Sequence, residues 1–381
     1  MHSTGTLLVS TTDFGWGSIG KLRLILDELD GLDIMMDDAS NTAELAAQVI
    51  GGRHRFVHSH GAPAAAALVV NDPVSADRIT RSGTPVVYVD SLPYLWTTAS
   101  EVPAGAAVYC AQRSPAGALP PTSPLRQWAD VRWVEPIVPP PRRRRGGAGV
   151  VVSVGGLHSH LVGGASDAYL RAVLVPLVDA LISAGHRVAA VCGNLPVWAR
   201  IELAAMLPGC VHVGSFSAYE FEAALLRADA LFTSPGSTTI LQAASVGLPT
   251  ALLPPQNLSQ ILNTEIFGVP GGSVITWPGS VVDRTLVDEL RPAGEDAVLG
   301  YVYRQISEHS GDPAVRSVLR ERFRALAACT GVPDGLSPHL RELGHGGARH
   351  VARIVKQTIL APSPVEDSRW PLATGTRADA R

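Results

Sequence analysis

Residues 229–255 read DALFTSPGSTTILQAASVGLPTALLPP, and the order of patterns in this stretch decides the fold class. Its two ends, 229–234 and 250–255, are short apolar runs of the kind that form buried strands. The segment between them has the apolar spacing of a helix, and a Gly-Leu-Pro sequence ends it. A strand, a helix and a second strand in this order predict a parallel βαβ unit.

The helix of this unit begins with small and hydroxylated residues, SPGSTT at 234–239. One explanation is local, because hydroxyl side chains often cap helices. The other is functional, because a helix N-terminus offers free N–H groups and about half a positive charge to a phosphate. The stretch alone leaves both open.

The same alternation of strands and helices occurs in both halves of the chain. We expect other strands at 6–10, 56–60, 66–72, 85–91, 148–156, 186–193 and 210–216. We expect other helices at 168–185, 197–207 and 221–228, with helical patches within 312–360. The sequence therefore predicts an α/β protein with two Rossmann-like domains, doubly wound parallel sheets that face each other across a cleft. Ligands of such sheets bind at the carboxyl ends of the strands.

A Pro-, Arg- and Gly-rich segment, IVPPPRRRRGGAG at 137–149, separates the two halves. Its arginines could bind an anion, but an exposed connector is the simpler interpretation. The expected division is an N-terminal domain at 1–140, a linker at 141–147, a C-terminal domain at 148–345, a helix at 346–360 that could cross back, and a loose tail at 361–381.

Bulk properties exclude several classes of function. The net charge of −3 argues against binding to nucleic acid or a membrane surface through charge. The four cysteines are far apart in sequence, which favours neither a disulfide framework nor a zinc site. No signal peptide is evident, and no apolar run reaches the roughly 18 residues of a membrane span. We expect a reduced, cytoplasmic protein, and the oligomeric state stays open.

The loop after the first strand, TTDFGWGSIGK at 11–21, contains a Gly-x-Gly-x-x-Gly spacing. Its glycines are Gly15, Gly17 and Gly20. With Asp37 or Asp38 as the acidic partner, this spacing would fit an NAD-dependent dehydrogenase. The loop also carries Asp13, Trp16, Ser18 and Lys21, which a pyrophosphate turn does not need. These additional residues favour a site for another ligand over a dinucleotide site. A purely structural interpretation, a tight turn with a helix cap, also stays open.

The second half has comparable loops at its strand ends. Ser153, Gly155 and Gly156 follow a strand, where backbone N–H groups can face an anion. The His-x-His pairs, His58 with His60 and His158 with His160, lack a nearby third ligand, so we expect no metal site.

Neutral amides cluster after the helix that opened this section. Gln242 lies one turn beyond Thr238, on the same helical face. Four more amides follow the next strand: Gln256, Asn257, Gln260 and Asn263. Amides suit polyhydroxyl ligands because each supplies donors and an acceptor, and capping alone would not need four of them.

At these residues the chain resembles glycosyltransferases of the two-Rossmann-domain type, GT-B, over most of residues 6–360. The strongest match is 234–263, with Gln242 where many members have a ribose-binding glutamate. That segment is similar to the family of the bacterial enzyme that adds N-acetylglucosamine to the lipid-linked wall precursor. The motifs DFGWGSIGK at 13–21 and VDSLPYLW at 89–96 resemble cytosylglucuronate and hydroxymethylcytosylglucuronate synthases of nucleoside antibiotic biosynthesis.

The resemblance and the strand-end loops together give the expected site. The N-terminal domain would bind the acceptor and the C-terminal domain the nucleotide-sugar. Nucleotide-sugar contacts are expected at Ser153, Gly155, Gly156, Ser215, Phe216, Gly236, Ser237, Thr238 and Gln242. Substrate contacts are expected at Trp16, Gly17, Ser18, Asp90, Tyr94, His158, Gln256, Asn257 and Gln260. Trp16 could instead pack its loop against the core.

The implied reaction is an inverting transfer of a sugar, glucuronic acid by the resemblance, from a UDP-sugar to a pyrimidine base such as cytosine or hydroxymethylcytosine. The chain contains no Asp-x-Asp motif, so we expect a metal-independent reaction without a cofactor. Asp13 is the first candidate for the base, with His58 or His158 behind it, and Lys21 could pair with Asp13 or steer the donor. The alternatives are another UDP-sugar enzyme (a hydrolase, an epimerase or a transferase to an aglycone) and a non-catalytic nucleotide-sugar sensor.

Overall fold

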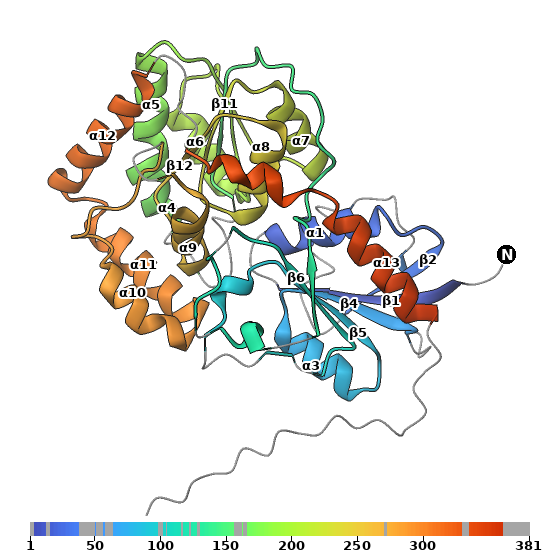
Figure 1. The fold of residues 1–381 in the computed structure, drawn as a ribbon. Helices are drawn as coiled ribbons and strands as arrows, with labels where there is room; N and C mark the ends of the chain where they lie inside the picture. Colours follow the sequence, from blue (N-terminus) through green and yellow to red (C-terminus); the bar gives the residue numbers. More distant parts are fainter. Residues whose placement is uncertain are drawn as a thin grey trace, which may run out of the picture.

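The computed structural model describes residues 4–12, 16–37, 50, 56–57, 64–97, 102–103, 105–115, 117–121, 123–127, 130–155, 162, 166–269, 273–329 and 335–360. These residues form two lobes, each built on one parallel sheet (Figure 1). The first lobe holds the sheet of residues 4–134 with the C-terminal helix 347–360, and the second lobe holds the sheet of residues 150–252 with its helices.

The first lobe has a seven-stranded sheet in the order β3-β2-β1-β4-β5-β6-β7. Its strands are β1 (Thr4–Thr11), β2 (Leu32–Met36), β3 (Phe56–Val57), β4 (Ala66–Val70), β5 (Val86–Asp90), β6 (Val108–Gln112) and β7 (Val131–Val134). In the register, Leu7 of β1 lies opposite Ile34 of β2 and Ala66 of β4. Strands β4 and β5 are buried along their whole length, as expected for a parallel sheet covered by helices on both faces.

The second lobe has a five-stranded parallel sheet in the order β10-β9-β8-β11-β12. Its strands are β8 (Val150–Ser153), β9 (Val188–Cys192), β10 (His212–Gly214), β11 (Ala230–Thr233) and β12 (Thr250–Leu252). The strand order reverses between β1 and β4 in the first sheet and between β8 and β11 in the second. Crevices at such reversal points are where doubly wound sheets bind ligands.

Helices cover both sheets (Figure 1). The α-helices are α1 (Gly17–Leu26), α3 (Pro73–Arg81), α4 (Ser166–Tyr169), α5 (Val175–Ser183), α6 (Val197–Met206), α7 (Ala218–Arg227), α8 (Ser237–Val246), α9 (Leu258–Phe267), α10 (Arg284–Leu290), α11 (Glu295–His309), α12 (Pro313–Ala327) and α13 (Gly347–Leu360). Short 3-10 turns occupy Pro93–Leu95, Pro124–Gln127, Arg291–Ala293 and Pro338–Leu343, and Leu170–Leu174 is π-helical. None of the described helices is both long and apolar enough to span a membrane.

Helix α13 returns from the second lobe and packs on the first sheet beside α1 (Figure 1). Its Val351 and Val355 are buried in the same apolar cluster as Leu7 of β1. The turn before α13 is held by Glu135, whose carboxylate accepts hydrogen bonds from the N–H groups of Gly346 at 2.7 Å and His345 at 3.0 Å. These two bonds lower the pKa of Glu135.

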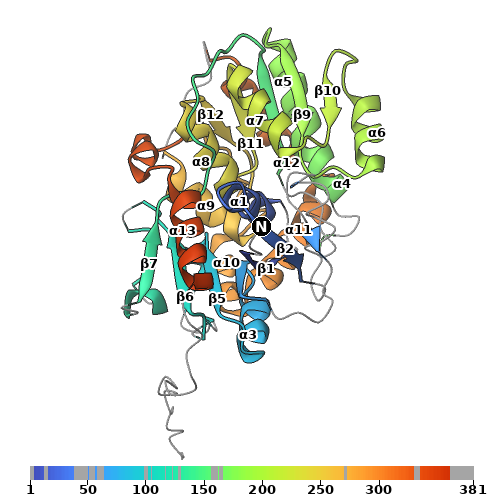
Figure 2. The same ribbon diagram turned by 90° about the vertical axis from the view of Figure 1, so that its right-hand side faces the viewer.

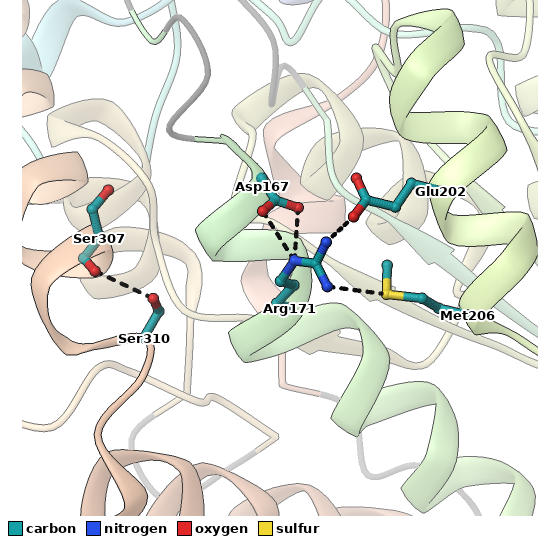
Figure 3. Close-up of polar contacts among 6 residues, drawn as sticks. All are labelled: Asp167, Arg171, Glu202, Met206, Ser307 and Ser310. Atoms are coloured by element: carbon teal, nitrogen blue, oxygen red, sulfur yellow. Dashed lines mark hydrogen bonds and ion pairs between the residues drawn. The ribbon is translucent and has the colours of Figure 1, made fainter.

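A polar cluster ties the π-helical segment to α6 (Figure 3). The guanidinium of Arg171 donates to Asp167 at 2.9 Å, pairs with Glu202 of α6 and lies 3.7 Å from the sulfur of Met206. The arginine side chain is about half exposed, so solvent screens these pairs and they contribute little to stability.

The predicted fold class is confirmed, since both lobes are parallel α/β sheets of the doubly wound kind. The expected helix at 168–185 is present as α4, the π-helical segment and α5 in succession. Strands β2, β6 and β7 were not predicted from the sequence. Strand β7 has an exposed Arg132 at the sheet edge, which weakens its apolar pattern. The expected domain boundaries stay predictions.

Replacing Gly347 should weaken the attachment of α13. An added Cβ would lie 2.0 Å from the carbonyl oxygen of Glu135 and 3.0 Å from Cγ1 of Ile137, so Gly347→Ala should lower the free energy of unfolding by about 1–3 kcal/mol. Thermal denaturation measures this. Gly300→Ala on α11 is the control: no atom lies within 4 Å of its added Cβ, and it should leave stability unchanged or raise it by roughly 0.5–1 kcal/mol. If Gly347→Ala and Gly300→Ala had the same free energy of unfolding, the close packing of α13 against Glu135 and Ile137 would be contradicted.

Candidate functional site

A cavity of about 760 Å³ lies between the two lobes, at the carboxyl ends of their strands. In the first lobe, Thr12 and Asn71 follow β1 and β4 and line it. In the second lobe, Gly155 and Gly236 lie just beyond β8 and β11 and line it as well. The cavity therefore spans both reversal points of strand order, which is where this architecture places ligands.

The N-terminus of α8 opens into this cavity. Gly236 is the N-cap residue, and Ser237, Thr238 and Thr239 form the first turn, all of them lining the cavity. No side chain caps α8, whereas Ser217 caps α7 and Asn257 caps α9. The hydroxyls of the opening stretch are therefore not N-caps, and the partial positive charge of this helix end faces a space that can hold a ligand.

Lys21 of α1 reaches across the interface to this helix end. Its Nζ donates a hydrogen bond of 2.8 Å to Oγ1 of Thr238. The side chain is 1 % exposed, and burial lowers the pKa of Lys21 to about 7. Helix α1 lies between the two lobes in both views, and Lys21 joins it to α8 (Figure 1, Figure 2).

Two further contacts join the lobes beside the cavity. Arg23 of α1 is buried, pairs with Glu222 of α7, and lies 4.8 Å from the ring centroid of Tyr219. On the other side, the hydroxyl of Tyr94 donates to Oδ1 of Asn263 on α9. Tyr94 was expected in the acceptor pocket, but it does not line the cavity and instead joins the lobes.

Asp90 brings a buried carboxylate to the wall of the first lobe. It lies at the end of β5, is 2 % exposed and lines the cavity, as expected from the sequence. Its oxygens accept hydrogen bonds from Trp96 Nε1 at 2.5 Å, Tyr109 at 2.7 Å and the N–H of Leu92 at 2.8 Å. Burial raises the pKa of Asp90 although these donors favour the charged form.

Asn71 was missed by the sequence analysis, although it ends a predicted strand. Its φ of 56° makes it the one non-glycine residue with positive φ among the described residues. Its amide donates to Ser18 at 2.8 Å and Ser91 at 2.9 Å, and its oxygen accepts from the N–H of Ser91. Backbone strain held by such a network is typical of functional sites. The sequence feature that could have pointed to Asn71 is the Asn-Asp-Pro sequence directly after a strand.

The glycine loop of the first lobe contributes Trp16, Gly17 and Ser18 to the cavity wall. Trp16 both lines the cavity and packs against the apolar cluster of the first lobe, so the two interpretations of this residue coexist. Asp37, considered as an acidic partner for a dinucleotide, is buried away from the cavity and pairs with Arg78.

In the second lobe, Ser153, Phe216 and Gln242 line the cavity as the sequence led us to expect. Gln242 lies on α8, one turn beyond Thr238. The ring of Phe216 stacks on His212 with centroids 5.5 Å apart. Ser215 differs, because its hydroxyl is used structurally, donating to the carbonyl of Leu195 at 2.8 Å, and it does not line the cavity.

The amides after β12 have structural roles that the sequence analysis did not foresee. Gln256 is buried outside the cavity lining and donates to Ser234 at 2.6 Å, so it is not placed to face a sugar. Asn257 and Gln260 do line the cavity, but Asn257 caps α9 and Gln260 accepts from the N–H of Gln256 at 2.9 Å.

Four charged residues of the cavity wall were missed: Asp72, Arg291, Glu295 and Asp296. Glu295, the first residue of α11, accepts from the N–H of Ser259 at 3.2 Å, and burial raises the pKa of Glu295 to about 7. Arg291 of the preceding 3-10 turn donates to the carbonyl of Tyr94 at 2.7 Å. Arg291 and Glu295 follow helix α10 and do not lie in a loop at a strand end, which is where the sequence pointed to ligand contacts.

Several expected residues lie outside the described part of the chain. These are Asp13, Gly156, His58 and His158, together with Gly15 of the glycine spacing, Asp38 as the alternative acidic partner, and His60 and His160 of the His-x-His pairs. Among the described residues, no group of three His, Cys, Asp or Glu side chains could hold a metal ion.

Comparison with known proteins gives a family and several distant structures. The family described as "CGA synthase-related protein" matches residues 25–267. Acinetobacter baumannii MurG is 12 % identical, with 92 % of this chain and 99 % of that chain covered and a TM-score of 0.48. The glycosyltransferase SnogD from Streptomyces nogalater is 14 % identical, with 93 % and 99 % covered and a TM-score of 0.47. Phytolacca americana UGT2, complexed with UDP-2fluoro-glucose and pterostilbene, is 12 % identical, with 93 % and 99 % covered and a TM-score of 0.48. No curated protein sequence matches the chain.

The strained conformation of Asn71 predicts an unusual order of stability among its variants. Asn71→Ala loses the three hydrogen bonds and keeps the positive φ, whereas Asn71→Gly loses the same bonds but adopts this φ freely. We expect Asn71→Ala to be less stable than Asn71→Gly by about 1–2 kcal/mol, measured by denaturant unfolding. An alanine variant at least as stable as the glycine variant would show that position 71 is not in this conformation.

Proposed function

Because the chain belongs to the CGA synthase-related protein family, we propose that it is an inverting, metal-independent glycosyltransferase that uses a UDP-sugar. The donor is UDP-glucuronate and the acceptor a pyrimidine base such as cytosine or hydroxymethylcytosine. The observation that carries the proposal is the uncapped N-terminus of α8, which opens into the cavity between the lobes with Lys21 beside it. The family name is consistent with the resemblance of the motifs at 13–21 and 89–96 to cytosylglucuronate synthases.

The second lobe would bind the donor. The first turn of α8, Gly236 to Thr238, holds the diphosphate through backbone N–H groups and the helix dipole. Gln242, one turn further on and also in the cavity wall, reaches the ribose. Phe216 lies at the end of the cavity that follows β10, where its backbone would pair with uracil.

The first lobe would bind the acceptor. Trp16 supplies an aromatic surface on which a flat base can stack. Asp90 presents a carboxylate whose orientation is fixed by three donors, so it can accept a hydrogen bond from an exocyclic amine. The two substrates would then meet between the lobes, which excludes water from the reacting atoms.

In the proposed reaction, a ring nitrogen of the base attacks the anomeric carbon of the donor. The new C–N bond forms on the face opposite to the breaking C–O bond, so an α-linked donor gives a β product and UDP departs with the electron pair. The N–H groups of α8 and the Lys21 ammonium stabilise the charge on UDP, an effect that commonly contributes several kcal/mol (roughly 3–4 for one donor). The proton of the ring nitrogen passes to Asp13, with His58 and His158 as the other candidates.

The decisive assay combines UDP-glucuronate and cytosine with the protein and detects the conjugate by mass spectrometry. We expect a product with the mass of cytosine plus a glucuronosyl group, together with stoichiometric UDP. Asp13→Asn should reduce turnover by about 100-fold or more, while affinity for UDP stays near that of the wild type. Binding of UDP without any product would favour a sensor, release of free sugar would favour a hydrolase, and binding of NAD but not UDP would favour a dehydrogenase.

The Lys21 pKa predicts how donor affinity depends on pH. Only the charged ammonium attracts the diphosphate, and burial places its pKa at about 7 in the free protein. Binding must therefore take up a proton once the pH exceeds 7, so affinity for UDP-glucose should fall by up to tenfold per pH unit above that value. UDP-glucose is the suitable probe because its diphosphate diester keeps its charge over this range. Calorimetry in several buffers measures both the affinity and the proton uptake.

Lys21→Met is the matched control, since methionine fills a similar space without a charge. It should bind UDP-glucose more weakly than the wild type at about pH 6 and show no change between about pH 6 and 9. A variant that retains the wild-type pH dependence would assign that dependence to another group.

A further inference from the structure

The charges on the cavity wall are strongly unequal. Arg291 is the one basic side chain among the described residues that line the cavity. The acidic side chains of the same lining are Asp72, Asp90, Glu295 and Asp296. Lys21 lies behind the α8 turn and outside this lining. Apart from the Lys21 ammonium at the α8 helix end, an anionic group on a ligand in this cavity therefore has one cationic side chain to meet, that of Arg291.

Arg291 is held in place but not neutralised. Its Nη2 donates to the carbonyl of Tyr94 at 2.7 Å, which fixes the side chain across the interface between the lobes. Its Nε is buried and has no hydrogen-bond partner among the described residues. No ion pair within 4.0 Å joins it to a carboxylate in the part of the chain that the structure describes, whereas Arg284 nearby pairs with Glu265 and Asp288. Burial lowers the pKa of Arg291, but a guanidinium stays protonated in proteins.

The position of Arg291 separates it from the helix end assigned to the diphosphate. It lies in the 3-10 turn that joins α10 to α11. Glu295, the first residue of α11, bonds to the N–H of Ser259 at the start of α9. Arg291 therefore belongs to the side of the cavity formed by α9 and α11, where Asn257 and Gln260 also line the wall. This is the side on which the sugar of a donor bound at α8 would lie.

We propose that Arg291 binds the carboxylate of a uronic acid donor and thereby selects it over the neutral hexose. The inference rests on the proposed function, because it assumes a UDP-sugar in the cavity. A planar guanidinium with free N–H donors matches the geometry of a carboxylate, which a hydroxymethyl group cannot reproduce. A neutral sugar gives the guanidinium no anionic partner, and sites of this kind discriminate strongly against the analogue that lacks the partner group.

The test compares three ligands by calorimetry: UDP, UDP-glucose and UDP-glucuronate. The proteins are the wild type, Arg291→Gln, Arg291→Lys and the control Arg284→Gln, which removes a neighbouring positive charge outside the cavity lining. We expect the wild type to bind UDP-glucuronate more tightly than UDP-glucose. Arg291→Gln should lose about 10- to 100-fold in affinity for UDP-glucuronate and change less than about twofold for UDP and UDP-glucose.

The other arms separate a specific contact from general effects. Arg291→Lys keeps the charge without the planar fork and should fall between the wild type and the glutamine variant. Arg284→Gln should leave all three affinities unchanged. Thermal denaturation of each variant confirms that the fold is intact, and retained affinity for UDP shows that the nucleotide site is intact.

Three results would overturn the inference. An equal loss for UDP and UDP-glucuronate would make Arg291 a phosphate ligand, or a purely structural link to Tyr94. Unchanged affinity for UDP-glucuronate would show that the carboxylate lies elsewhere. Failure of the wild type to bind UDP at all would overturn the proposed function and this inference with it, so the two failures are distinguishable.

Discussion

The hydrogen bond from Lys21 to Thr238 is the contact on which the site depends, because it joins the two lobes at the mouth of α8. It holds α1 against α8, so that the carboxyl ends of both sheets face one cavity. Burying an ammonium is unfavourable, and the cost appears as a pKa of about 7. A diphosphate at the same helix end would restore the favourable environment for the charged form. The same side chain therefore joins the two lobes and lies at the helix end proposed to bind the diphosphate.

The polar residues around this contact divide into those that hold the lobes in shape and those left for a ligand. Tyr94, Asn263 and Gln256 are buried and bonded to other parts of the protein, and only Asn263 of these three lines the cavity. The first turn of α8 has no side-chain cap, and Arg291 has a buried donor without a partner among the described residues. Groups left unsatisfied at a cavity wall indicate binding more strongly than groups that are merely polar.

Much of the fold was predictable from the sequence, because alternating apolar runs and helical patterns fix a parallel sheet with few alternatives. The N-terminus of α8 was predictable for a similar reason, because glycine and hydroxyl residues at a strand–helix junction are a local sequence signature. Gln256 and Ser215 could not be placed, because whether an amide or hydroxyl faces a ligand or the core depends on tertiary neighbours such as Tyr303 and Leu195. Arg291 and Glu295 were missed because their role arises only when α10 and α11 pack beside α9. The strain at Asn71 could be recognised only from the structure, because what marks it is the positive φ.

A crystal structure of the protein with UDP-glucose tests the central claim most directly. We expect the phosphate oxygens to lie within hydrogen-bond distance of the N–H groups of Ser237 and Thr238, with the Nζ of Lys21 beside them. We expect the hexose on the α9 and α11 side of the cavity. Phosphates bound over the glycine loop around Gly17 and Gly20, or UDP-glucose bound outside the cavity, would contradict it.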